Sequence, residues 1–151
     1  MAFATASEDM DSLTFGTKVL LRGFNSKKEP ILQIDLDQVL EGFDMSMDEF
    51  IDLCILCGCD YTTNINGVGP IKAFKYISHL GGKIENVIRK IERENDNPWK
   101  KKKYHIPENF FYKEARELFK APDAIKERKK LEELIKWNKT DEEGMKEFLI
   151  G

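Results

Sequence analysis

Two aspartates near the start of the chain, Asp9 and Asp11, are the first residues whose type and spacing could support chemistry. They follow the small apolar run "AFATAS", which predicts a buried strand. On an extended backbone, side chains two residues apart point to the same side, so both carboxylates can converge on one hard divalent cation. Aspartates in such a stretch also cap tight turns, and both interpretations stay open on spacing alone.

Asp60 is the third acid of interest, because it follows a predicted helix. The stretch "MSMDEFIDLCILCG" has Ser46 as a helix N-cap and Glu49 three residues later, which is the pattern of a capping box. Gly58 ends this helix and places Asp60 at the exit of an anchored element. Helical spacing predicts a buried stripe made of Met47, Phe50, Ile51, Cys54 and Cys57.

The stretch "NINGVGPIKAFKYI" has the composition of a turn that binds a backbone. Gly67 and Gly69 allow a tight turn that brings amide N–H groups close to a partner. Pro70 starts a helix whose free amides and dipole attract anions. This is the helix-hairpin-helix pattern, and Lys72 and Lys75 on its second helix are candidates for salt-dependent phosphate contacts. An ordinary tight turn between packed helices is the alternative.

Around these residues the sequence predicts strands and helices first, and then helices only. Strands are expected over residues 2–7, 18–24 and 30–36, and the polar turn "NSKKE" makes the second and third an antiparallel pair. Helices are expected over residues 37–43, 45–58, 70–82, 83–94, 110–121, 123–137 and 141–151. No convincing strand follows Asp60, so we expect the boundary between the part with strands and the all-helical part near this residue.

The composition of the 151 residues is that of a globular protein, since 41% of them are hydrophobic and 11% are aromatic. No apolar run approaches the roughly 20 residues of a membrane span. Cys54, Cys57 and Cys59 do not form a disulfide framework, which favours a reducing, intracellular location. They fit a helix core better than a zinc site, which needs four ligands.

Charge is distributed unevenly along the chain. Residues 1–60 carry 4 Lys/Arg against 12 Asp/Glu, whereas residues 61–151 carry 20 against 15. The split predicts an acidic site in the first part and a surface for a polyanion in the second. The run "NPWKKKKYH" sets four lysines beside Trp99 and Tyr104 and is a further candidate for backbone contact and base stacking. A solvated loop is the alternative.

Four motifs occur in order: "ASEDMDSLTFG", "LCILCGCDY", "INGVGPIKA" and "IPENFFYKEARELF". Together they closely resemble the flap endonucleases of the XPG nuclease family over essentially the whole chain. The resemblance implies an α/β fold, with the C-terminal part of a PIN-like nuclease core in residues 1–59. An all-helical helix-hairpin-helix (helix-3-turn-helix) subdomain follows in residues 60–151. It also implies that the chain is the C-terminal half of the nuclease core of a longer protein.

The resemblance implies site residues as well. Three acids match a two-metal Mg²⁺ site, in which Mn²⁺ can substitute: Asp9, Asp11 and Asp60. A K⁺ ion is implied at the backbone carbonyls of three hairpin residues: Asn64, Ile65 and Val68. The DNA-contacting residues are those of the hairpin and of the helix after it: Gly67, Gly69, Lys72 and Lys75. Ile71 departs from relatives that often carry a basic residue at this place.

The resemblance implies that the parent protein is a Mg²⁺-dependent 5′-flap endonuclease of DNA replication and repair. Its implied location is the nucleus, and mitochondria in addition; its partners are branched duplex DNA and a sliding clamp, engaged through a tail beyond Gly151. The isolated chain is expected to bind duplex DNA without cleaving it, because three carboxylates do not complete two metal sites. The alternatives are a duplex-binding module without catalysis and a 5′–3′ exonuclease relative, against which "IPENFFYKEA" argues.

Overall fold

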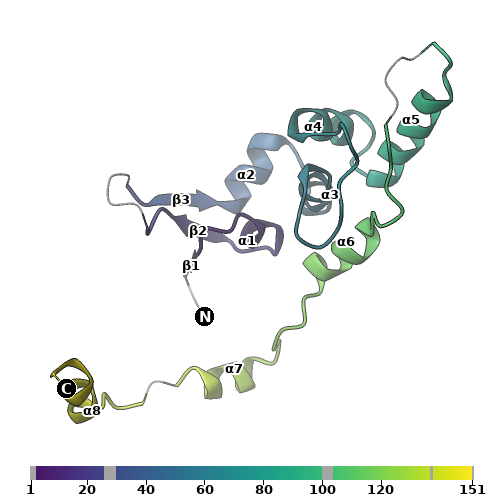
Figure 1. The fold of residues 1–151 in the computed structure, drawn as a ribbon. Helices are drawn as coiled ribbons and strands as arrows, with labels where there is room; N and C mark the ends of the chain where they lie inside the picture. The colour runs from purple at the N-terminus through teal and green to yellow at the C-terminus, as the bar shows by residue number, and fades with distance from the viewer. Residues whose placement is uncertain (1–2, 26–29, 100–103, 137, 151) are drawn as a thin grey trace.

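A three-stranded sheet forms the first part of the computed structural model, which describes residues 3–25, 30–99, 104–136 and 138–150 (Figure 1). Its strands, in spatial order, are β1 (Thr5–Ala6), β2 (Val19–Arg22) and β3 (Leu32–Asp35). β1 pairs with β2 in parallel, and β2 pairs with β3 antiparallel, with Leu20 opposite Ile34. The predicted antiparallel pair is confirmed, and its turn at residues 26–29 lies outside the described residues.

The first strand differs from the buried strand predicted over residues 2–7. β1 has two residues, both exposed, and the side chain of the preceding Phe3 is 81% exposed. Among the described strands, β1 lies at the edge of the sheet and pairs with β2 only. Small apolar residues favour burial, but burial needs a second layer of structure against the strand. That layer is supplied by other elements and cannot be predicted from the strand itself.

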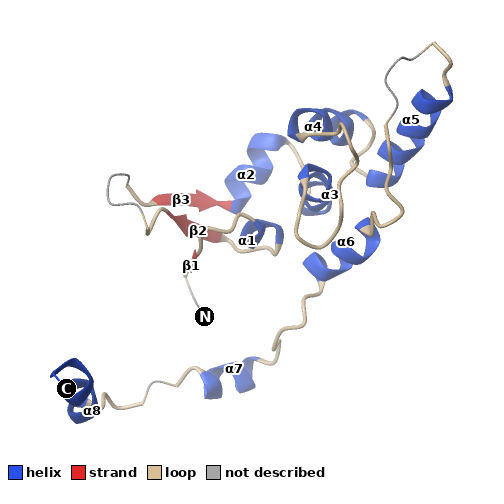
Figure 2. Cartoon of the chain, in the orientation of Figure 1, coloured by secondary structure: helices blue, strands red, loops and turns tan. Residues whose placement is uncertain are grey.

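Helices make up most of the remaining chain, as Figure 2 shows. Their bounds are α1 (Asp11–Thr14), α2 (Leu36–Phe43), α3 (Met47–Cys57), α4 (Pro70–His79), α5 (Ile84–Asp96), α6 (Tyr112–Lys120), α7 (Arg128–Leu134) and α8 (Glu142–Ile150). After Asp60 the described ranges contain an isolated bridge between Asn66 and His105 but no strand, as predicted.

The predicted start and stop of α3 and the predicted start of α4 are confirmed, whereas α4 ends at His79 and not at residue 82. α3 begins with a complete capping box, in which Ser46 and Glu49 bond each other's backbone N–H groups. It ends at Gly58, whose φ of 116° favours glycine. α4 has Pro70 as its first residue, where the missing N–H costs nothing.

α3 lies at the centre of the molecule (Figure 1), and its predicted single buried stripe is only partly correct. Phe50 and Ile51 are buried, but Met47, Cys54 and Cys57 are half-buried. The other buried residues of α3 are Asp52, Leu53, Ile55 and Leu56. One stripe is typical of a helix on a surface, whereas α3 packs against two hydrophobic clusters on different sides.

The two clusters share α3 unequally. Phe50 packs in a small cluster with residues of the sheet side: Leu13, Leu20 and Leu36. The other buried apolar residues of α3, which are Ile51, Leu53, Ile55 and Leu56, pack in a large cluster with side chains of α4, α5 and α6. The large cluster therefore contains residues from both sides of Asp60. The division into residues 1–59 and 60–151 stays a prediction.

α7 and α8 bury no residue, and Figure 1 shows them trailing away from the rest of the chain. Four large apolar side chains of α8 are at least half exposed: Met145, Phe148, Leu149 and Ile150. Within the described ranges, every helix is too short or too polar to cross a lipid bilayer.

Candidate metal centre and nucleic-acid interface

The acidic pair lies in a turn between β1 and α1. Met10 has helical backbone angles, with φ −71° and ψ −21°, and Asp11 is the first residue of α1. Asp9 Oδ1 accepts the backbone N–H of Asp11 at 2.9 Å. The expected extended backbone is therefore wrong, and Asp9 caps the turn. Since this bond uses one carboxylate oxygen, capping and cation binding by Asp9 are compatible.

Glu8, which precedes the pair, is turned toward β2. Its Oε1 atom accepts the backbone N–H groups of Gly23 at 2.9 Å and Phe24 at 3.2 Å. Arg22 Nε lies 3.8 Å from the other oxygen of this carboxylate. Glu8 therefore fastens the first strand to the end of β2 and does not join the acidic pair.

Asp60 approaches the pair from the exit of α3. Partial burial raises the pKa of Asp11, and repulsion from Asp9 and then Asp60 raises it further. Repulsion of this kind falls with distance and with screening by water, so Asp9 and Asp60 each lie within electrostatic reach of Asp11. The structure thus places Asp60 within electrostatic reach of Asp11, although about fifty residues separate the two in the sequence.

An aromatic contact supports this approach, and the sequence analysis did not find it. Phe15, in the "TFG" turn after α1, packs edge-to-face against Tyr61, with ring centroids 5.9 Å apart. Both rings also contact Phe119 of α6, at centroid distances of 4.8 Å and 5.2 Å. Since Tyr61 directly follows Asp60, these rings hold the α1 turn beside the end of α3.

The three acids suit a hard divalent cation in their chemistry. Mg²⁺ prefers carboxylate oxygens, and a bound cation relieves the repulsion that raises the pKa of Asp11. They do not form a closed cage, because no three His, Cys, Asp or Glu side chains of the described residues are placed to hold an ion. Mg²⁺ commonly takes several of its ligands from water and substrate phosphate, so the assignment of the three acids to part of a metal site stays a prediction.

The cysteines near Asp60 contribute packing. Cys54 packs against the small cluster, whereas Cys57 and Cys59 pack against the large one. Burial raises the pKa of all three thiols, to about 11 for Cys54. Because the thiolate is the form that binds metal, this environment disfavours metal binding by the cysteines.

The glycine hairpin of residues 64–69 is anchored by two buried side chains. Ile65 is 1% exposed and Val68 is 5% exposed, and both belong to the large cluster. Gly67 has φ 86°, a conformation that favours glycine. Gly69 is the N-cap of α4, and its extended backbone delivers the chain into Pro70.

The outer side of the hairpin offers backbone groups to a partner. Within the described residues, the amide N–H groups of Gly67, Gly69 and Ile71 have no hydrogen-bond acceptor. They lie at or near the start of α4, where the helix dipole is positive. Residues 64–69 line an open hollow of about 550 Å³. The arrangement can accept an anion such as a phosphate group.

The two candidate lysines of α4 differ in their surroundings. Lys75 is exposed, as expected for a side chain that contacts a bound strand. Lys72 is half-buried, and its Nζ atom donates to the Gly67 carbonyl at 2.9 Å and to the Tyr104 hydroxyl at 3.3 Å. The lysine run beside Tyr104, at residues 100–103, lies outside the described residues.

Comparisons with known proteins agree with this geometry. The family model described as the XPG I-region matches residues 1–60. Flap endonuclease 1-1 of Paramecium tetraurelia is 46% identical over 152 residues, and flap endonuclease 1 of Tetrahymena thermophila is 45% identical over 148 residues; both matches cover 98% of the chain. The chain belongs to the XPG nuclease family.

This XPG-family chain spans 38% of the length of either relative. Flap endonuclease-1 from Methanococcus jannaschii has a TM-score of 0.63 and 26% identity, over 83% of the chain and 34% of its own. The Holliday junction-resolving enzyme GEN1, solved with product DNA and Mg²⁺, has a TM-score of 0.65 and 25% identity, over 95% of the chain and 40% of its own. These likenesses confirm the predicted fold, an α/β nuclease core followed by a helical subdomain.

A buried ion network fastens the helical part of this XPG-family chain, and the sequence analysis missed it. Asp52 of α3 is 2% exposed. Arg116 of α6 donates to its two oxygens at 2.6 and 2.7 Å, and also to Glu85 of α5 at 2.9 Å. The backbone N–H of Ile84, at the start of α5, donates to Asp52 at 3.0 Å. The sequence does contain a signal for this network, because Asp52 stands between Ile51 and Leu53 in an apolar helix.

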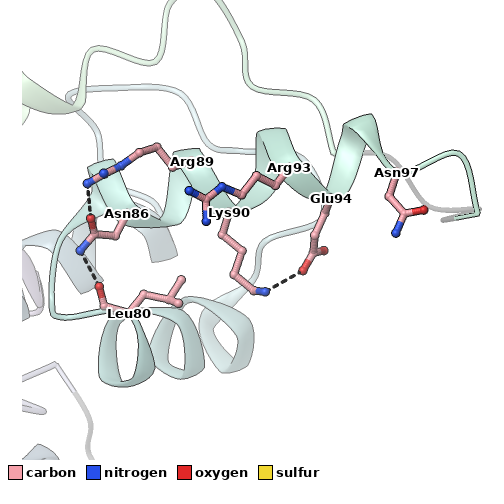
Figure 3. A pocket seen from close by; sticks show the side chains of 7 residues that line it. All are labelled: Leu80, Asn86, Arg89, Lys90, Arg93, Glu94 and Asn97. Atoms are coloured by element: carbon pink, nitrogen blue, oxygen red, sulfur yellow. Dashed lines mark hydrogen bonds and ion pairs between the residues drawn. The ribbon is translucent and has the colours of Figure 1, made fainter.

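A second hollow, of about 390 Å³, lies between the end of α4 and α5 (Figure 3). Three of its lining residues are cationic: Arg89, Lys90 and Arg93. Asn86 bonds both the Leu80 carbonyl and the Arg89 guanidinium, and Lys90 pairs with Glu94 at 3.2 Å (Figure 3). This face of α5 is positively charged, in accord with the basic balance of residues 61–151.

Proposed function

We propose that this chain is the C-terminal half of the nuclease core of a structure-specific 5′-flap endonuclease, and that alone it binds duplex DNA without cleaving it. The observation that carries the proposal is the hairpin. In the described part of the chain, its outward amides have no internal acceptor and stand at the positive end of α4. Such groups bind backbone phosphates without reading bases. Relatives that match 98% of the chain are named flap endonucleases.

The acidic site and the hairpin are neighbours along the chain. Asp60 precedes Asn64, the first residue lining the hairpin hollow, by four positions. A strand held by the hairpin therefore passes near the acids. Asp9, Asp11 and Asp60 would hold Mg²⁺, or Mn²⁺ in its place, together with ligands from elsewhere in the protein. Two such ions, when bound, stabilise the attacking and leaving oxygens of phosphodiester hydrolysis.

A K⁺ ion at the carbonyls of Asn64, Ile65 and Val68 belongs to the same proposal. The Ile65 carbonyl accepts the Val68 N–H at 3.0 Å, and a carbonyl oxygen has a second lone pair for a cation. The ion would add a positive charge at the hairpin that favours a bound phosphate. For the parent protein we also propose a sliding-clamp partner and a nuclear and mitochondrial location, from the role of the family in replication and repair.

The proposal is tested with the 151-residue chain and a 5′-flap DNA substrate. Binding followed by fluorescence anisotropy should weaken as salt rises, because bound phosphates release counterions. Incubation with Mg²⁺ should leave the flap intact, because the three acids are only part of two metal sites. Robust cleavage would refute the non-catalytic reading, and binding that ignores salt would refute phosphate recognition.

Asp60→Asn should weaken divalent-cation binding to the chain. Loss of groups that merely support a metal ligand costs roughly 10–100-fold in affinity, so removal of a ligand charge should cost at least about tenfold. Mn²⁺ titration by electron paramagnetic resonance measures the effect. Asp44→Asn is the matched control, because Asp44 is an exposed C-cap of α2 in a left-handed conformation that asparagine also adopts. Equal binding by Asp60→Asn and wild type would remove Asp60 from the ligand set.

A further inference from the structure

Lys72 was expected to contact a DNA phosphate, but its ammonium group is bonded within the protein. It donates to the Gly67 carbonyl at 2.9 Å and the Tyr104 hydroxyl at 3.3 Å, and it lies 5.0 Å from the centre of the Tyr104 ring. We propose that, for the DNA binding proposed above, Lys72 is a positioning residue. It holds the hairpin in its binding shape and makes no phosphate contact of its own.

Tyr104, the partner of Lys72, is held in place by residues of two helices. Asn95 of α5 accepts the Tyr104 backbone N–H at 2.8 Å and donates to the Tyr104 carbonyl at 2.6 Å. Tyr76, one turn after Lys72 on α4, shares a side-chain hydrogen bond with Tyr104, and the bonds from Tyr76 and from Lys72 lower the pKa of Tyr104. Lys72 is therefore tied to a side chain that cannot easily move.

In the hairpin, Lys72 contacts the peptide group between Gly67 and Val68, whose conformation needs to be held by hydrogen bonds. Gly67 has no side chain to restrict its backbone, and its φ is 86°. Lys72 holds the Gly67 carbonyl, while the N–H of the same peptide group, on Val68, donates to Ile65 at 3.0 Å. Next to it, the Asn66 N–H donates to the His105 carbonyl at 3.2 Å. These bonds turn the remaining amides outward before any partner arrives.

A preformed hairpin binds DNA more tightly because it loses less conformational entropy on binding. Lys72 contributes through that ordering, whereas an exposed lysine contributes through counterion release. Lys75 lies on the same helix and is exposed, so it is the matched comparison. The two roles predict different results in the free protein, where no DNA is present.

Amide hydrogen exchange and salt-dependent duplex binding, measured on Lys72→Met, Lys72→Arg and Lys75→Met, separate these roles. Lys72→Met should speed exchange of the Asn66 and Val68 amides and lower duplex affinity by roughly tenfold, the effect of one hydrogen bond to a charged group. Its salt slope should stay near that of wild type, and Lys72→Arg should restore both properties. Lys75→Met should reduce the salt slope by about 0.9 without changing exchange.

Unchanged exchange at Asn66 and Val68 in Lys72→Met would overturn the positioning role, whatever happens to affinity. A fall of about 0.9 in its salt slope, together with unchanged exchange, would assign Lys72 to the phosphate instead. Exchange of the buried α4 residue Ile77 reports that the fold survives. Wild type that binds no duplex would defeat the proposed function, and the exchange result in the free protein would still decide the role of Lys72.

Discussion

Arg116→Met should lower the free energy of unfolding by about 3–5 kcal/mol, the usual cost of leaving one partner of a buried ion pair alone. The substitution removes the guanidinium that bonds both oxygens of Asp52, a carboxylate that is 2% exposed. The Ile84 N–H stays as a partner, but it carries no full charge to balance the carboxylate. Urea denaturation followed by circular dichroism measures the loss.

Lys120→Met is the matched control on the same helix. Lys120 pairs with Asp48 at 2.7 Å, but the two side chains are 36% and 71% exposed, and such pairs contribute at most about 1 kcal/mol. Adding Asp52→Asn to Arg116→Met should recover part of the loss, because a neutral amide is less costly to bury than a charge. An Arg116→Met variant as stable as Lys120→Met would show that the network contributes little.

The same network predicts a pH effect with a definite sign. Hydrogen bonds from Arg116 lower the pKa of Glu85 below its ordinary value. A carboxylate with a lowered pKa stabilises the fold above its unfolded pKa, and this contribution disappears as the pH falls through the folded value. When the pH is lowered from neutral to acidic, the free energy of unfolding should therefore fall less for Arg116→Met than for wild type, because the variant lacks the Arg116 bonds that stabilise the Glu85 carboxylate.

Features encoded by neighbouring residues were predictable from the sequence. The capping box of Ser46 and Glu49, the stop at Gly58 and the start at Pro70 each depend on a few adjacent positions. The antiparallel pair of β2 and β3 followed from two apolar runs around a polar turn. The glycine hairpin was found because glycine is needed where the backbone takes a positive φ, as it does at Gly67.

Features that depend on distant partners were not predictable. Asp52 is buried because Arg116, 64 residues later, reaches it, and no local pattern pairs the two. Lys72 is turned inward because Tyr104 is fixed beside it by Asn95. The rule for strand side chains failed at Asp9 because the backbone already turns at Met10. For Asp52 and Lys72 the local pattern was read correctly, but partners distant in the sequence decided the outcome.

Gly69→Val should reduce duplex affinity by roughly tenfold or more, since it blocks at least one charge-assisted amide–phosphate bond. Gly69 has φ −97° and ψ 179°, which any residue can adopt, and a Cβ there would meet no atom within 4 Å. The new side chain therefore enters the open hollow of the hairpin rather than the protein core. The expected loss arises from steric exclusion of the bound strand.

Measurements of protein stability and of the salt dependence of binding distinguish steric exclusion of the strand from unfolding of the variant. Valine is a poorer N-cap than glycine, so Gly69→Val should cost roughly 1 kcal/mol of stability and leave the fold intact. Gly42→Val is the control, because a Cβ at this α2 residue also meets no atom within 4 Å and the site lies outside the hairpin. Anisotropy titrations at several salt concentrations should show a shallower slope for Gly69→Val alone. If a folded Gly69→Val binds with the affinity and slope of wild type, the hairpin is an ordinary turn and the strand is held elsewhere.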